Sequence, residues 1–320
     1  MTYTTDYKIY TPRLKSKGNR PVSYNRKLGD FTYGYDPSVL HAFGLDSVNF
    51  CFFILWDGDK TDGRFNQVVW IKREVSISED APINLNAPLF EEKFYQSAPK
   101  GDIHRNQAFF KAHGIDCRYM VIKDLHENYA LKDETHVAVE VLAADDGILK
   151  KTPISLEYMK RLLIENSNGP FKIGKPLNYY ETDLEHYLSL HSKETGALFP
   201  GDCDLLLFDG RQKCRAVVEF KKCTPYGNIP VQYQSFLNYI KLDRSKYIRL
   251  NIMRQYFEWI EGQKIPFINV FYPTTREGCI KLELVKNDLE PGLSMVIPME
   301  DDPYRNQYGI MEKIVKNFHT

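Results

Sequence analysis

Short apolar runs rich in β-branched and aromatic residues recur through the first half of the chain. Residues 49–56 (NFCFFILW) and 67–75 (QVVWIKREV) enclose a polar segment that begins DGDKTDGR. Strand-length runs joined by a polar loop are typical of a β-hairpin. Residues 118–123 (RYMVIK) and 136–142 (HVAVEVL) also have the length and composition of strands. The first half is therefore predicted to be mainly β.

The pattern changes near Asp145, where DDGILKKTP brings charges, a glycine and a proline together. Such a stretch favours a domain boundary. After it, residues 155–166 carry leucine and methionine at helical spacing, with Ser155 placed as an N-cap. We expect a β-rich domain over residues 1–145, which selects or senses something, and a second α/β domain over residues 146–320.

The most informative stretch begins with a helix start. The sequence TDLE from Thr182 fits a capping box, and apolar residues follow at helical spacing. Asp204 then stands at the head of an apolar strand over residues 205–208, and Asp209-Gly210-Arg211 forms a turn. The returning strand begins with residues 214–220 (CRAVVEF), with Glu219 and Lys221 near its end. The two strands are predicted to pair as a hairpin.

The spacing of Glu219 and Lys221 places both side chains on one face of the strand, with Phe220 directed into the core. If Asp204 lies opposite them, two carboxylates and a lysine converge. Close carboxylates repel one another unless a cation lies between them, and Mg²⁺ is the natural hard cation for oxygen ligands. Such an ion polarises a phosphate and lowers the pKa of a bound water, while Lys221 either neutralises charge in the transition state or positions the attacking water.

The residues GDCDL, from Gly201, followed by VVEFK, ending at Lys221, and a glutamine-rich segment resemble the PD-(D/E)XK nuclease superfamily, in its RecB-like or resolvase-like branch. The resemblance covers roughly the second half of the chain. It implies a restriction-endonuclease-like mixed β-sheet flanked by helices. It also implies that Asp204 and Glu219 bind metal, that the carbonyl of Phe220 assists, and that Lys221 is the catalytic lysine.

Two further positions follow from the same resemblance. An acidic residue of the preceding helix often completes the metal shell in that family, which implies Glu185 first and Glu181 second. RecB-like members carry Gln-x-x-x-Tyr after the lysine, but here neither Gln232 nor Gln234 has a tyrosine four residues on. Both glutamines therefore stay alternatives for a contact to phosphate or water.

The segment after Lys221 contains basic residues among apolar ones. Helices are expected over residues 229–239 and 245–261, strands over 267–272 and 279–285, and a closing helix over 311–318. Candidate phosphate contacts are Lys222 and Arg249, with Lys246 and Arg254 on the same helix as Arg249. The alternative is that this charged stripe is an ordinary solvated helix face.

Composition narrows the classes of function. The chain has 42 basic and 42 acidic side chains, so its formal net charge is zero, which excludes a generally basic, histone-like binder. No apolar run approaches the length of a membrane helix and no secretory signal is visible, which predicts a cytoplasmic protein without membrane contact. The six scattered cysteines are expected to be reduced. The basic, tyrosine-bearing first thirty residues are either a solvated arm or a phosphate-contacting one.

The combined reading is a nuclease that needs Mg²⁺, or Mn²⁺ in its place, and serves restriction, phage defence or DNA repair. DNA is the expected nucleic acid partner, RNA stays open, and a homodimer is compatible with the sequence. Two alternatives remain: a type II restriction endonuclease whose first domain reads bases, and a noncatalytic binding module that retains the fold without metal.

Overall fold

The computed structural model divides the chain into two compact units. The first contains residues 37–49 and the described residues from Cys203 onward; the second contains the described residues between Phe50 and Asp202. The structure describes residues 15–16, 37–54, 68–75, 92, 94–95, 100–123, 136–143, 149–166, 179–180, 201–223, 229–241, 244–273 and 278–318. Within these residues the protein is mixed α/β, with sheets of six and four strands in the two units.

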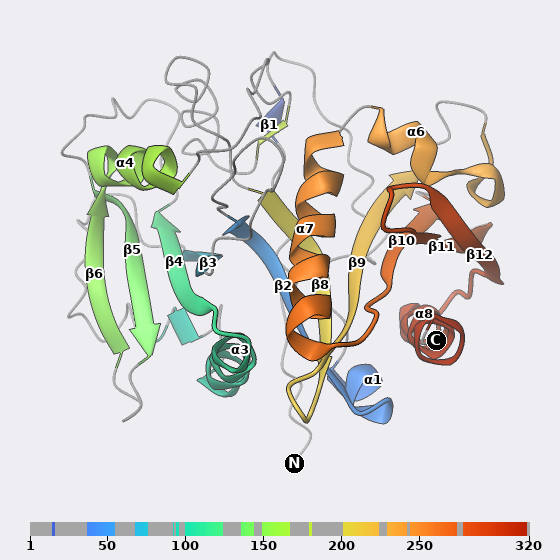
Figure 1. Cartoon of the computed structure of the whole chain (residues 1–320), viewed down its shortest axis with the longest axis horizontal. Helices are drawn as coiled ribbons and strands as arrows, with labels where there is room; N and C mark the ends of the chain where they lie inside the picture. Colours follow the sequence, from blue (N-terminus) through green and yellow to red (C-terminus); the bar gives the residue numbers. More distant parts are fainter. Residues whose placement is uncertain are drawn as a thin grey trace. The chain divides into compact units, whose positions relative to one another are not determined.

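The sheet of the first unit has the strand order β12-β11-β10-β9-β8-β2 (Figure 1). Strands β9 and β10 are parallel, whereas β8–β9, β10–β11 and β11–β12 are antiparallel. The strands are β2 (Leu45–Ile54), β8 (Gly201–Asp209), β9 (Cys214–Cys223), β10 (Phe267–Pro273), β11 (Cys279–Val285) and β12 (Pro291–Pro298). The helices of this unit are α1 (Pro37–Ala42), η1 (a 3₁₀ turn, Val231–Tyr233), α6 (Phe236–Ile240), α7 (Arg244–Glu261) and α8 (Pro303–Asn317).

Alternation along the strands gives this sheet two different faces. On one face, residues such as Leu205, Val218 and Phe220 pack in a single apolar core with α1 and α8. On the other face, Tyr247 of α7 lies near Phe236 of α6 and Phe267 of β10, at ring-centroid distances of 4.7 and 6.1 Å. Helix α7 therefore covers the face opposite α1 and α8.

The second unit is built on the strand order β3-β4-β5-β6, and residues 52–54 of β2 pair with β3. Its strands are β3 (Val68–Val75), β4 (Asp116–Lys123), β5 (His136–Ala143) and β6 (Leu149–Ser155), and its helices are α3 (Lys100–Ala112) and α4 (Leu156–Asn166). Strands β3 and β4 are parallel and are connected through α3, whose buried face includes Phe109 and Phe110. A short pair, β1 (Lys15–Ser16) with β7 (Tyr179–Tyr180), also belongs to this unit.

The units differ from the domains expected from sequence. Residues after Asp145 do not leave the first-half sheet, because β6 pairs antiparallel with β5, from His136↔Ser155 to Ala143↔Leu149. The second unit accordingly continues to Asp202. The part of residues 1–145 that the structure describes also contains the helices α1 and α3, which the sequence did not predict.

Several predicted elements are confirmed. The β2–β3 and β8–β9 hairpins form, and β4, β5, β10 and β11 overlap their predicted ranges. Helix α4 begins after Ser155, whose Oγ accepts a hydrogen bond from the backbone N–H of Tyr158 at 3.2 Å. The prediction of one helix over residues 229–239 is wrong: Gln234 and Ser235 are extended (ψ 147° and 149°), which separates η1 from α6. The C-terminal helix begins earlier than predicted, at Pro303.

Five cysteine side chains are described, all as free thiols, and four of them are buried. In the part of the chain that the structure describes, no helix has both the length and the apolar composition to cross a membrane. The basic first thirty residues, Thr182 and the loop after β2 lie outside the described residues, apart from β1.

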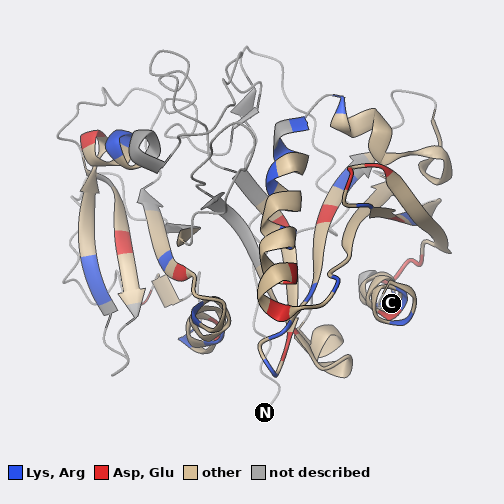
Figure 2. Ribbon diagram, in the orientation of Figure 1, with Lys and Arg blue, Asp and Glu red and all other residues tan. Residues whose placement is uncertain are grey.

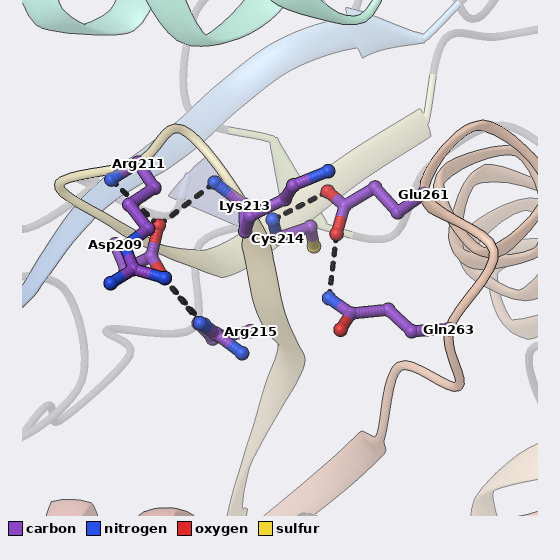
Figure 3. Close-up of polar contacts among 7 residues, drawn as sticks. All are labelled: Asp209, Arg211, Lys213, Cys214, Arg215, Glu261 and Gln263. Carbon is purple, nitrogen blue, oxygen red and sulfur yellow. Dashed lines mark hydrogen bonds and ion pairs between the residues drawn. The ribbon is translucent and has the colours of Figure 1, made fainter.

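The turn of the β8–β9 hairpin is fixed by Asp209 (Figure 3). Its Oδ1 accepts hydrogen bonds from the backbone N–H groups of Arg211 and Lys213 at 2.9 and 3.0 Å, and its Oδ2 pairs with Arg215. Close by, Oε1 of Glu261, the last residue of α7, accepts the backbone N–H of Cys214 at 2.6 Å. The C-terminal end of α7 is thereby tied to the first residue of β9.

The Asp209→Ala variant should lower the free energy of unfolding by about 2 kcal/mol at neutral pH, since it removes a partly buried carboxylate that accepts four charge-assisted hydrogen bonds, two of them from Arg215. Burial alone would raise the pKa of Asp209, but the hydrogen bonds from Lys213, Arg215 and Arg211 outweigh burial and hold the pKa below its ordinary value. A lowered folded-state pKa stabilises the protein above the unfolded pKa, and this stabilisation is lost as pH falls through the folded pKa.

The stabilities of the wild type and of Asp209→Ala, measured by urea unfolding, should therefore differ most at neutral pH and converge as pH falls through the lowered folded-state pKa of Asp209. Asp209→Asn keeps one acceptor oxygen and serves as the milder control. A difference that stays constant between pH 7 and pH 3 would show that the carboxylate charge contributes nothing.

Candidate functional site

A row of polar residues crosses the sheet face beneath α7. The β8–β9 register contains Leu205↔Val218, which puts Asp204 beside Glu219 at the next position. Asn269 on β10 pairs with Glu219 in the parallel ladder and with Glu283 of β11 in the antiparallel one. The row thus runs from Asp204 through Glu219 and Asn269 to Glu283, and all four residues are buried.

Two carboxylates and two lysines meet at the β8–β9 end of this row. Oε1 of Glu219 accepts hydrogen bonds from Nζ of Lys221 at 2.7 Å and lies 2.6 Å from Nζ of Lys246, in the first turn of α7. The same Lys246 ammonium is 3.6 Å from Oδ1 of Asp204. The side chains of Glu219 and Asp204 are 1% and 8% exposed, and those of the two lysines 16% and 13%. The structure therefore brings Asp204, Glu219 and Lys221 together, and it adds Lys246.

Asp204 is held by the backbone of β9. Its Oδ2 accepts a hydrogen bond from the backbone N–H of Phe220 at 2.7 Å. The N–H and C=O of one strand residue point toward the same neighbouring strand, so the Phe220 carbonyl also faces the β8 side. The Phe220 side chain lies in the apolar core on the opposite face, as the alternation predicted. Strand β8 begins at Gly201, so Asp204 lies within the strand and not at its head.

Aromatic rings position Lys221. Its Nζ is 5.3 Å from the ring centroid of Tyr247 and 5.7 Å from that of Tyr239, within the range of cation–π attraction. Burial raises the pKa of the Tyr239 hydroxyl, and the neighbouring Cys223 raises it further. Tyr239 therefore stays neutral at physiological pH and donates its hydrogen bond to Oε1 of Gln234, at 3.5 Å. Lys221 is held between a carboxylate and two ring faces.

A second buried pair, on β11, anchors the segment that carries Tyr239. Nζ of Lys281 lies 3.1 Å from Oε1 of Glu283 and donates to the backbone carbonyl of Gln234 at 2.5 Å. Oε2 of Glu283 accepts the backbone N–H of Phe236 at 2.6 Å. These bonds satisfy polar groups at the break between η1 and α6, which explains why the chain is extended there instead of forming one helix.

Of the remaining predicted site residues outside α7, only the two glutamines have described side chains. Glu185 and Glu181 lie outside the described residues, and the side chain of Lys222 is not described. Gln232 is exposed and accepts a weak hydrogen bond from Sγ of Cys279 at 3.6 Å. The side chain of Gln234 accepts the hydrogen bond from the Tyr239 hydroxyl. The roles assigned to all of these residues stay predictions.

The basic stripe expected on helix 245–261 does not form a solvent-facing surface. Arg249 and Arg254 are 7% and 2% exposed, and Arg254 donates to the backbone carbonyl of Val285 at 3.1 Å. The burial of Arg249 does not favour its predicted role as a contact to nucleic acid. Burying a cation without a partner is costly, which explains why the Arg254 guanidinium is bonded to Val285 and Asn251 inside the protein.

Sequence reasoning missed the place of Lys246 in the site, although the signal was present. Lys246 shares helical spacing with Leu250, Met253 and Phe257, all of them fully buried against the sheet. The apolar residues Ile248 and Ile252 of the same helix lie on a different face and are only half-buried. With the correct helix face, Lys246 would have been predicted to point toward β9.

The donor set fits a hard divalent cation. Asp204 and Glu219 supply carboxylate oxygens, the Phe220 carbonyl faces the same side, and Oε2 of Glu219 is buried without a hydrogen-bond partner among the described residues. A buried carboxylate oxygen without a partner is costly, and a cation would satisfy it. The site contains two carboxylates, Asp204 and Glu219. Within the described part of the chain, no group of three or more His, Cys, Asp or Glu side chains is arranged to hold a metal.

Comparison with protein-family models finds no match, and comparison with curated proteins finds none. Among solved structures, the chain is similar to the C-terminal domain of the sex pheromone staph-cAM373 precursor from Staphylococcus aureus, with 9% identity and a TM-score of 0.16. The match covers 73% of this chain and 64% of that one, so the chain spans about 64% of the length of the structure it matches. A similarity this low carries no argument about fold or function.

Proposed function

We propose that the protein is a divalent-metal-dependent nuclease with a restriction-endonuclease-like fold, of the PD-(D/E)XK kind, that hydrolyses phosphodiester bonds of DNA. One observation carries the proposal: Asp204, Glu219 and Lys221, chosen from their spacing in the sequence, meet at one place on the sheet. Supporting it, the hairpin β8–β9 is followed by α7 and by β10 parallel to β9, which is a mixed sheet with helices on both faces.

Each residue has a distinct part in the proposed reaction. Asp204 and Glu219 would hold Mg²⁺, with the Phe220 carbonyl and Glu185 as further ligands. When bound, a divalent cation supplies charge for the phosphate oxygens and a bound water of lowered pKa. Lys221, fixed by Glu219 and two tyrosine rings, would place its ammonium against the charge that develops on the phosphate in the transition state.

The first test is metal binding measured by titration calorimetry. Wild-type protein should release or absorb heat with Mn²⁺ or Mg²⁺, and Asp204→Asn should abolish that binding, because the change removes one of two carboxylate charges while keeping the acceptor for the Phe220 N–H. Lys264→Met is the control, because Lys264 is exposed and pairs with Glu258. This variant should bind metal as the wild type does. An unchanged dissociation constant in Asp204→Asn would contradict the proposed metal site.

The second test is incubation with circular plasmid, linear duplex, single strands and RNA, each with Mg²⁺, Mn²⁺ or EDTA. Cleavage that requires metal and disappears in Asp204→Asn is the expected result. Discrete plasmid fragments would identify a type II restriction enzyme, whereas a smear or loss from the ends would identify a nonspecific nuclease or an exonuclease. Absence of cleavage on all four substrates would contradict the proposal.

A second candidate function, a noncatalytic nucleic-acid or protein-binding module, is favoured by one specific observation. Lys246 contacts both carboxylates, so a cation of the chain itself already neutralises them. If that arrangement is permanent, the cluster is a structural ion network. The absence of calorimetric heat with either metal, in a folded wild-type protein, would select this candidate. The cytoplasmic location and the homodimer stay predictions.

A further inference from the structure

We propose that Lys246 is a tethered counter-cation: its ammonium stands in for the metal between Asp204 and Glu219 and moves away when a divalent cation binds. This inference rests on the proposed function and adds a regulatory step to it. The contacts of two lysines with the same carboxylates carry the argument.

The two lysines differ in what holds them. Lys221 contacts Oε1 of Glu219 at 2.7 Å and lies against the rings of Tyr239 and Tyr247, so its position is fixed from several sides. Lys246 bridges the carboxylates, 2.6 Å from Glu219 and 3.6 Å from Asp204. A point charge bridging two carboxylates has the place and the sign that a metal ion would have. Lys246, unlike Lys221, therefore competes directly with the metal.

The charge pattern of α7 indicates that Lys246 is stabilised by the two carboxylates of the site and not by its position in the helix. Three of the four basic residues of α7 lie in its N-terminal half, and its two acidic residues, Glu258 and Glu261, lie near its C-terminal end (Figure 2). This order opposes the helix dipole, which favours acidic residues in the first turn and basic ones in the last. Lys246 in the first turn is thus unfavourable for the helix alone, and the two carboxylates compensate for it.

The Lys246 side chain is also able to move away from the two carboxylates. Its side chain is 13% exposed, so it is not fully enclosed, and a lysine carries its charge on a flexible four-carbon chain. A divalent cation and an ammonium at the same carboxylates repel each other strongly at such short range. The tie between Glu261 and Cys214 at the other end holds α7 in place, so the side chain and not the helix is expected to move.

Calorimetric titration with Mn²⁺ tests the competition. Lys246→Met should bind Mn²⁺ about tenfold more tightly than the wild type, since the competing cation is gone. Lys221→Met removes the same charge at nearly the same distance from Glu219 and should change the affinity much less. Lys264→Met, 71% exposed and remote from the carboxylates, should leave the affinity unchanged.

A second measurement uses the wild type, so it does not depend on the folding of a variant. Brief acetylation followed by mass spectrometry should modify Lys246 slowly without metal, because its ammonium is paired and mostly buried. Saturating Mn²⁺ should raise its reactivity relative to Lys264 about tenfold as the side chain is released.

The outcomes separate the two proposals. No binding of Mn²⁺ by wild-type protein overturns the proposed function and with it this inference. Binding of Mn²⁺ with no change in Lys246 reactivity, or with equal affinities in Lys246→Met and Lys221→Met, overturns the counter-cation while the metal site stands. Release of Lys246 by Mn²⁺ supports the inference even if Lys246→Met does not fold.

Discussion

Lys221→Ala is expected to lower the rate of phosphodiester cleavage by about two to three orders of magnitude while nucleic acid and metal still bind. The reason is that Lys221 is paired with the Glu219 carboxylate and is held in position by that residue and two tyrosine rings. A preorganised cation of this kind contributes most where negative charge develops, in the transition state, and little to ground-state binding.

The measurement is single-turnover cleavage at saturating enzyme, with affinity for the uncleaved substrate determined separately in Ca²⁺. A loss in rate with an unchanged dissociation constant identifies an interaction made in the transition state. Lys264→Ala provides the matched control, because it removes an exposed lysine that pairs with Glu258 at the end of α7. Full cleavage by Lys221→Ala would remove the lysine from the mechanism.

Glu219→Gln should be the most destabilising single change in the site, lowering the free energy of unfolding by about 3 kcal/mol. Glu219 is fully buried, and its Oε1 is the shared partner of Lys221 and Lys246. The glutamine keeps the size and an acceptor oxygen but removes the charge, so two mostly buried ammonium groups lose their main counter-ion. Burying a cation without its counter-ion costs far more than an exposed pair gains.

Urea unfolding monitored by circular dichroism measures this effect. Glu312→Gln is the matched control, since Glu312 pairs with Lys316 on the exposed side of α8 and its loss should not measurably change stability. The loss of stability in Asp204→Asn should lie between those of Glu219→Gln and Glu312→Gln. The asparagine oxygen still accepts the Phe220 N–H, and the Lys246 ammonium is farther from Asp204 than from Glu219. Equal stabilities of Glu219→Gln and wild type would show that the cluster is more hydrated than its burial indicates. This prediction holds whether or not the protein cleaves nucleic acid.

Local patterns in the sequence predicted much of the first unit. The alternation around Phe220 placed Glu219 and Lys221 on one face, and the turn at Asp209 paired β8 with β9. Both features depend on residues within a few positions of each other, where strand alternation and turn chemistry act directly. The missed helix α3 shows the limit of such patterns, since its segment mixes polar residues with Phe109 and Phe110 and becomes a helix by packing beside β4.

The sequence by itself determined the hairpin, its polar face and the three residues of the candidate site. The tertiary structure decided what surrounds them: Lys246 reaches the carboxylates because α7 crosses from β9 to the parallel strand β10, and Asn269 and Glu283 extend the row because β10 and β11 pair in that register. The tertiary structure also decided that residues after Asp145 continue the second unit. Such contacts join residues far apart in the chain, and they depend on which faces pack together and in which register, which no local pattern specifies.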